Sequence, residues 1–110
     1  MLSLHCSKNK KDLCAYVVHY TPLKERKIFL DKQFKKEKID HEFITNLDRE
    51  NLKEEQLKIF NRKHLSLSGC AITLGHIEAY KKICSSTYDY NLVLEDDVVF
   101  SNSFKSRLQE

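Results

Sequence analysis

The segment at residues 90–100 reads Tyr-Asn-Leu-Val-Leu-Glu-Asp-Asp-Val-Val-Phe and decides the fold. Its apolar run at 92–94 is typical of a short strand that is buried on both faces of a parallel sheet. Three consecutive carboxylates follow, Glu95, Asp96 and Asp97, and a second apolar, strand-like run at 98–100 comes directly after them. We therefore expect the acids at the carboxyl end of a buried strand, where open α/β sheets bind their ligands.

The acidic triplet has two interpretations. Carboxylates enclosed between apolar runs need a partner or a cation, and Mg²⁺ or Mn²⁺ is a suitable cation because both prefer hard oxygen ligands. The alternative is a solvated turn. Gly, Pro, Asn or Ser usually marks such a turn, whereas Leu94 and Val98 flank this triplet. The flanking residues favour a metal site.

The first half of the chain predicts a strand, a helix and a second strand. Residues 13–20 are rich in Val and Tyr and end at Thr21-Pro22, which is typical of a strand followed by a turn. Thr21 suits the cap and Pro22 the first turn of a helix that extends to Ile39. Its expected apolar side consists of Leu23, Ile28, Leu30 and Phe34. Residues 40–45 predict the second, shorter strand.

The second half begins with a charged stretch at 49–64, which indicates either a loosely packed helix or a mobile excursion. Hydroxyls within 65–68 can cap a helix over 69–85, whose broad apolar face predicts that neighbours wrap most of it. A third strand is expected at 89–94 and a last helix from residue 102. Alternating strands and helices predict βαβ units, hence a Rossmann-like α/β fold with a mainly parallel sheet.

Composition excludes several classes of protein. The 110 residues allow one domain, expected at 13–110 after a polar tail at 1–12. A net charge of +3 is small, and no aromatic platform is apparent, so we expect no nucleic-acid partner. The first dozen residues contain no run of seven or more apolar residues, so we expect no secretory signal, and no run approaches the ~20 apolar residues of a membrane span. We therefore expect a cytoplasmic protein. With two glycines a Gly-rich phosphate loop is impossible, and metal and side chains would hold any nucleotide.

Three segments, at residues 16–26, 69–80 and 92–98, resemble the glycosyltransferase family 25 domain in order and spacing. This family includes bacterial lipopolysaccharide β-galactosyltransferases and procollagen galactosyltransferases. Leu-Glu-Asp-Asp-Val at 94–98 is the most specific match, and the family's Ser-His is replaced here by Gly75-His76. The resemblance covers 13–110 but only the amino-terminal half of the family domain, which implies a truncated domain.

The resemblance implies a GT-A fold, a UDP-sugar donor (commonly UDP-galactose) and a Mn²⁺ or Mg²⁺ ion. It implies that Asp97 ligates the metal directly, that Glu95 takes part in the metal site, and that Glu95 and Asp96 hold the metal's waters or the ribose of the donor. The remaining residues expected to bind the donor are Tyr20, Thr21, Arg26 and His76. No residue is assigned as the catalytic base.

Two functions remain open on this evidence. The first is a metal-dependent glycosyltransferase that moves a sugar to a glycan or to a protein-linked acceptor. The second is a truncated, non-catalytic remnant that acts as a nucleotide-binding or partner-binding module. Truncation would leave an unpaired sheet edge, so we also expect self-association or a second chain that supplies the missing half.

Overall fold

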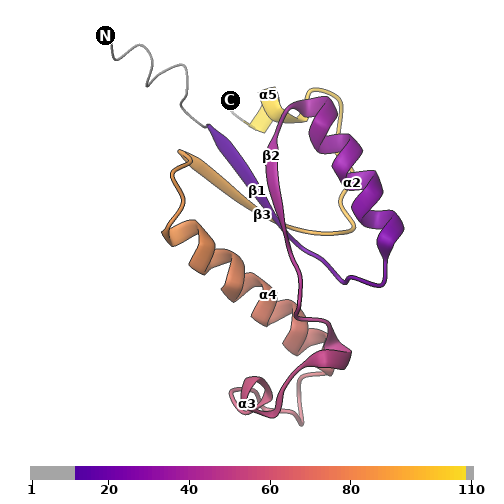
Figure 1. Cartoon of the computed structure of the whole chain (residues 1–110), viewed down its shortest axis with the longest axis vertical. Coiled ribbons are helices and arrows are strands. Elements are labelled where there is room, and N and C mark those ends of the chain that lie inside the picture. Colours follow the sequence, from indigo (N-terminus) through magenta and orange to yellow (C-terminus); the bar gives the residue numbers. More distant parts are fainter. Residues whose placement is uncertain (1–11, 109–110) are drawn as a thin grey trace.

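A three-stranded, entirely parallel sheet forms the centre of the molecule (Figure 1). The structure is a computed structural model that describes residues 12–108. Strand β1 (Leu13–Val18) lies between β2 (Asp40–Ile44) and β3 (Tyr90–Glu95) and pairs in parallel with both. The predicted α/β fold with a parallel sheet is confirmed. The polar tail predicted at 1–12 lies, apart from Asp12, outside the described residues.

The two long helices cover opposite faces of the sheet, because successive side chains of β1 point to opposite sides. Leu13, Ala15 and Val17 pack in one cluster with residues of α2 (Lys24–Glu37), while Cys14 and Tyr16 pack in a second cluster with Ala79 of α4 (Leu67–Cys84). The continuous hydrophobicity of the first strand therefore reflects burial on both faces.

Helix α2 begins later than the sequence indicates. The helix is preceded by a turn in which the Leu23 N–H donates to the Tyr20 carbonyl at 3.0 Å, and Leu23, not Thr21, occupies the N-cap position. The prediction that Thr21 caps the helix is therefore wrong, because the Thr21 hydroxyl donates to Asp48 instead. Leu30 is fully buried as expected, whereas Ile28 is 56% exposed and does not belong to the buried face.

Helix α4 packs by one narrow side rather than being wrapped by its neighbours, so that prediction is also wrong. Its buried residues are Cys70, Gly75 and Ala79, while Ile72 and Tyr80 are exposed. The Ser66 side chain caps the helix by accepting a hydrogen bond from the Gly69 N–H. The helix approaches β1 closely at Gly75, where an added Cβ would lie 2.5 Å from Cγ1 of Val18.

The apolar run at 98–100 is not a strand, contrary to expectation. It leaves the sheet and crosses α2, where Gln33 accepts a hydrogen bond from the Phe100 N–H at 2.7 Å and donates to the Val98 carbonyl at 3.4 Å. The Phe100 ring packs edge-on against Phe34, with the ring centroids 5.1 Å apart, and stacks on Phe104 at the start of α5 (Phe104–Leu108). The apolar residues Val98 and Phe100 therefore complete the core beside α2.

The charged stretch forms two short helical turns, η1 (Arg49–Asn51) and α3 (Glu54–Leu57). They belong to a segment at 46–66, called here the 46–66 arm, which extends beyond the carboxyl ends of the strands at the bottom of Figure 1. No residue from 49 to 69 is buried. Within residues 12–108, no helix combines the length and the apolar character that crossing a membrane requires.

Candidate functional site

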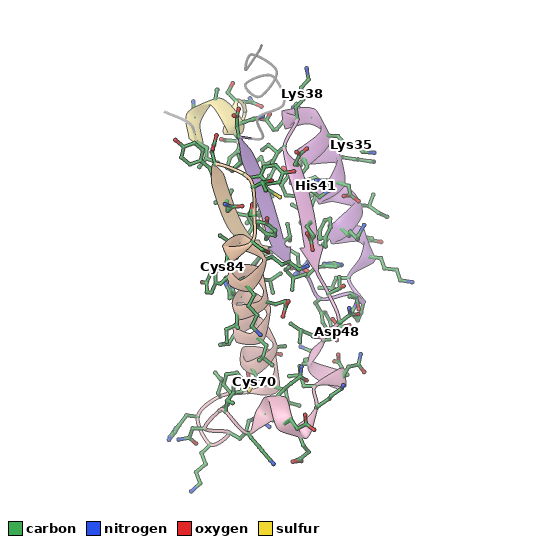
Figure 2. The ribbon with its side chains drawn as sticks, turned by 60° about the vertical axis from the view of Figure 1, so that its left-hand side comes forward. Lys35, Lys38, His41, Asp48, Cys70 and Cys84 are labelled. Atoms are coloured by element: carbon green, nitrogen blue, oxygen red, sulfur yellow. The ribbon has the colours of Figure 1, made fainter. Side chains whose placement is uncertain are left out.

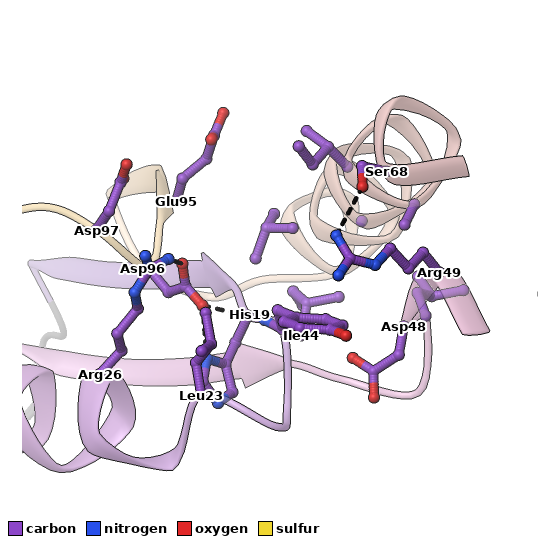
Figure 3. A pocket seen from close by; sticks show the side chains of 16 residues that line it. His19, Leu23, Arg26, Ile44, Asp48, Arg49, Ser68, Glu95, Asp96 and Asp97 are labelled. Carbon is purple, nitrogen blue, oxygen red and sulfur yellow. Dashed lines mark hydrogen bonds and ion pairs between the residues drawn. The ribbon is translucent and has the colours of Figure 1, made fainter. Parts of the chain in front are cut away.

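A pocket of about 310 Å³ lies at the carboxyl ends of the strands (Figure 3). The last residues of all three strands and the segments that follow them contribute to its lining, and α2 and α4 supply the rest. Parallel strands end at the same edge of the sheet, so residues distant in the sequence meet there. The polar and charged lining residues are His19, Tyr20, Arg26, Asp48, Arg49, Ser68, Glu95, Asp96 and Asp97.

Asp96 is the anchor of the acidic triplet. It is only 8% exposed, and one carboxylate oxygen accepts hydrogen bonds from His19 Nδ1 at 2.8 Å and from the Tyr20 N–H at 3.0 Å. The other oxygen accepts from Arg26 Nη1 at 3.0 Å. Burial alone would raise the pKa of Asp96, but the bonds from Tyr20, His19 and Arg26 outweigh it and hold the pKa below its usual range. An ionised acceptor requires that His19 Nδ1 carries the proton.

Glu95 and Asp97 are arranged differently from Asp96. Both are exposed, and Figure 3 shows their carboxylates pointing to the same side while Asp96 turns toward His19 and Arg26. Nε2 of His76 lies 3.6 Å from a carboxylate oxygen of Glu95. Within residues 12–108, no three His, Cys, Asp or Glu side chains are placed together to hold a metal. Two carboxylates still fit Mg²⁺ or Mn²⁺, because such ions commonly take one or two protein carboxylates and complete their shell with water and phosphate.

The opposite wall of the pocket comes from the 46–66 arm and the turn after β1. Asp48 is buried and accepts hydrogen bonds from the N–H of Thr21, at 3.0 Å, and from its hydroxyl. Arg49 donates to the Ser68 hydroxyl at 2.9 Å, and its guanidinium lies 4.8 Å from the centroid of the Tyr20 ring. These contacts join the arm to the end of β1 and to the start of α4.

The structure gathers most of the residues predicted for the site. Those that line the pocket are Tyr20, Arg26, Glu95, Asp96 and Asp97. Thr21 and His76 are not lining residues, and each contacts one that is: Thr21 bonds to Asp48 and His76 faces Glu95. The guanidinium of Arg26, which is expected to bind the donor, donates a hydrogen bond to Asp96.

Sequence reasoning missed four polar lining residues: His19, Asp48, Arg49 and Ser68. His19 could have been found from the sequence, because it is a polar residue near the end of an otherwise apolar strand-like run. Asp48 lies in the polar exit of the second strand, but nothing there indicates a bond to Thr21. Arg49 and Ser68 carry no signal, because Arg49 is one of many charged residues in its stretch and Ser68 is one of two serines that can cap the next helix.

An open parallel sheet with an acidic pocket at its carboxyl edge defines the class of α/β proteins that bind ligands at the ends of their strands. Residues 13–110 match the family model described as glycosyltransferase family 25 (LPS biosynthesis protein). The chain belongs to this family, as the three quoted segments predict. Comparisons with curated proteins and with solved structures return no match.

Proposed function

We propose that this chain binds a UDP-sugar with Mn²⁺ or Mg²⁺ in the pocket at the carboxyl ends of the strands. In this proposal it acts as a GT-A-type glycosyltransferase that moves galactose to a glycan or protein-linked acceptor. The observation that carries the proposal is the pair of exposed carboxylates, Glu95 and Asp97, at the end of β3 in a chain of glycosyltransferase family 25.

The two exposed acids would hold the ion. A bound divalent ion neutralises charge on a diphosphate and acts as a Lewis acid as the nucleotide leaves. Asp97 is the principal candidate ligand, because it is exposed and no hydrogen bond or ion pair to its carboxylate is found among residues 12–108, whereas Glu95 also faces His76. Asp96 contributes indirectly, since its bonds to His19 and Tyr20, which follow β1, and to Arg26 of α2 immobilise the turn between the two ligands.

The other wall of the pocket would receive the nucleoside part of the donor. Tyr20 offers an aromatic face, and its hydroxyl donates to Glu50 at 2.6 Å, which holds the ring against the arm. Thr21 supports this wall through Asp48, so its role in donor binding would be indirect. The pocket therefore has an acidic end for the ion and an aromatic end beside Arg49.

Calorimetric titration of UDP and UDP-galactose, with and without Mn²⁺, tests the proposal. We expect binding that depends on Mn²⁺ and that weakens at least about tenfold in Asp97→Ala, because one carboxylate of the ion site is removed. Glu55→Ala is the matched control, since Glu55 is an exposed acid in the arm, outside the pocket lining. It should bind as the wild type does.

Three results would change the interpretation. Binding that is indifferent to Mn²⁺ or to Asp97→Ala would contradict the metal site. The absence of binding by the folded wild-type chain would overturn the proposed donor site. Metal-dependent binding without transfer to any acceptor tested would favour the alternative function, a nucleotide-binding module without turnover.

A further inference from the structure

We propose that His19 is a positioning residue, which orients Glu95 and Asp97 toward the metal by holding Asp96 between them. The proposal rests on the proposed function, because it concerns the same ion site. It gives Asp96 a different role from the one that the family resemblance implies, namely contact with the metal's waters or with the ribose. Asp96 acts here as the fixed point of the acidic turn.

The carboxylate of Asp96 is held from three directions. His19 and the Tyr20 N–H approach from the end of β1, and Arg26 approaches from α2. Both carboxylate oxygens are engaged, so the side chain is fixed by three hydrogen bonds. Because Glu95 and Asp97 are the covalent neighbours of Asp96, fixing its side chain restricts the directions in which theirs point.

His19 has the strongest influence among the side chains that hold Asp96. The His19 side chain is 2% exposed and the Arg26 side chain is 48% exposed. Water can replace an exposed donor but cannot reach a buried one, so the hydrogen bond that Asp96 loses with His19 is not replaced. The His19 ring also packs edge-on against Phe43 of β2, at 5.5 Å between ring centroids, which fixes its orientation.

This arrangement connects the ion site to the centre of the sheet. His19 and Asp96 are 77 residues apart in the sequence, and their hydrogen bond joins the ends of β1 and β3. In metal sites generally, partners that orient the ligands affect metal affinity by about 10- to 100-fold. We expect an effect of this size from a residue that does not touch the metal.

The test compares His19→Asn, His19→Gln and His19→Ala. The Asn amide nitrogen lies the same number of bonds from the backbone as Nδ1 of histidine and can donate to Asp96, whereas the Gln nitrogen lies one bond farther. The probe is Mn²⁺ in the presence of UDP, titrated by electron paramagnetic resonance of the free ion. His64→Ala is the control, because His64 is an exposed histidine of the arm.

We expect His19→Ala to weaken Mn²⁺ binding by about 10- to 100-fold, His19→Asn to stay within about threefold of the wild type, and His19→Gln to fall between them. A second readout needs no ligand: hydrogen exchange of the Tyr20 amide should accelerate in His19→Ala and stay slow in His19→Asn, because this amide donates to Asp96.

Wild-type Mn²⁺ affinity in a folded His19→Ala variant would overturn the positioning role and leave the proposed function intact. If His19→Ala does not fold, equal Mn²⁺ affinities of the Asn and Gln variants would overturn it in the same way. Failure of the proposed function gives a different result from failure of the positioning role alone. In the former case the wild type itself would bind no Mn²⁺ in the presence of UDP, and both proposals would be wrong.

Discussion

The two walls of the pocket are built in different ways. The acidic wall is anchored by Asp96, a buried carboxylate whose partners come from the segment directly after β1 and from α2. The wall formed by the 46–66 arm has no buried residue from position 49 onward, and the side-chain hydrogen bonds of Arg49 to Glu50 and Ser68 are exposed. Figure 2 shows Asp48 where the arm leaves the sheet, well apart from Cys84 at the far end of α4.

This difference separates a stable wall from one that can open locally. Segments with few buried apolar contacts and exposed hydrogen bonds open at lower free energy than the core. The ion pair between Arg49 and Glu50 adds little, because exposed pairs contribute only about 0–1 kcal/mol in water. We therefore expect the proposed ion site to be preformed, and the arm to close on the proposed donor after it binds.

The largest expected effect concerns the two glycines of α4, one beside each wall. An added Cβ at Gly75 would lie 2.5 Å from Cγ1 of Val18, a branched side chain fixed on β1. At Gly69 it would meet the flexible end of Leu65, at 2.6 Å. Gly75→Ala should destabilise the fold by about 1–3 kcal/mol through overpacking. Gly69→Ala should be neutral or stabilising by up to about 1 kcal/mol. Urea unfolding measures both.

The double variant Gly75→Ala, Val18→Ala is the control for this prediction. Removing the Val18 methyl groups makes room for the new Cβ, so the double variant should be less destabilised than the sum of the two single changes. Equal destabilisation by Gly75→Ala and Gly69→Ala would contradict the difference between the walls. A serine at position 75 would meet the same obstacle as alanine, because its Cβ would occupy the same place.

A smaller effect is expected at the base of the 46–66 arm. Asp48→Ala removes the buried acceptor for the N–H and hydroxyl of Thr21, which should cost about 1–2 kcal/mol. Asp48→Asn keeps one carbonyl acceptor and should cost less. Amide hydrogen exchange should accelerate throughout the arm in Asp48→Ala and remain unchanged in β1 and β3. Faster exchange in the strands as well would show that the arm is part of the same cooperative unit.

The elements of the fold were predictable because local patterns determine them. Val17 and Leu92 lie in short apolar runs, and the acids after Leu94 mark the end of β3, so the sheet and its acidic carboxyl edge follow from the sequence pattern. Residues 98–100 show the limit of this reasoning. An apolar run of this length can pair as a strand or fill a gap beside a helix, and only the position of Phe34 decides between them.

Long-range polar pairs were not predictable. The bond between His19 and Asp96 joins residues 77 positions apart, and no local pattern encodes it. Thr21 illustrates the same limit, since a threonine before Pro22 is a suitable helix cap until Asp48, 27 residues later, accepts its hydroxyl. The roles within the acidic triplet likewise depend on which side chain turns inward, and three consecutive acids give no indication of that.

The smallest expected effect is the pH dependence contributed by Asp96. Its pKa is lowered in the folded state, because the bonds from Tyr20, His19 and Arg26 outweigh the opposing effect of burial. Between the folded and the unfolded pKa the unfolded chain binds more protons, so stability rises with pH in that range. The contribution of Asp96 is therefore complete above its ordinary pKa of about 3.9 and is lost as the pH falls through its lower folded value.

Urea unfolding of the wild type and of Asp96→Asn between pH 6 and pH 3 isolates this contribution. At any pH, the slope of the unfolding free energy against pH that Asp96 contributes corresponds to less than one proton. Burial alone would raise the pKa of Asp31, but the bonds from His41 and Lys27 outweigh it and hold the pKa below its usual value. Because Asp31 is present in both proteins, its contribution cancels in the difference. The stability lost on acidification should be greater for the wild type. If the unfolding free energies of the two proteins fell in parallel with pH, the ionised carboxylate of Asp96 would be no more stable in the folded chain than in the unfolded one. The acidic wall would then lack the anchor that distinguishes it from the arm.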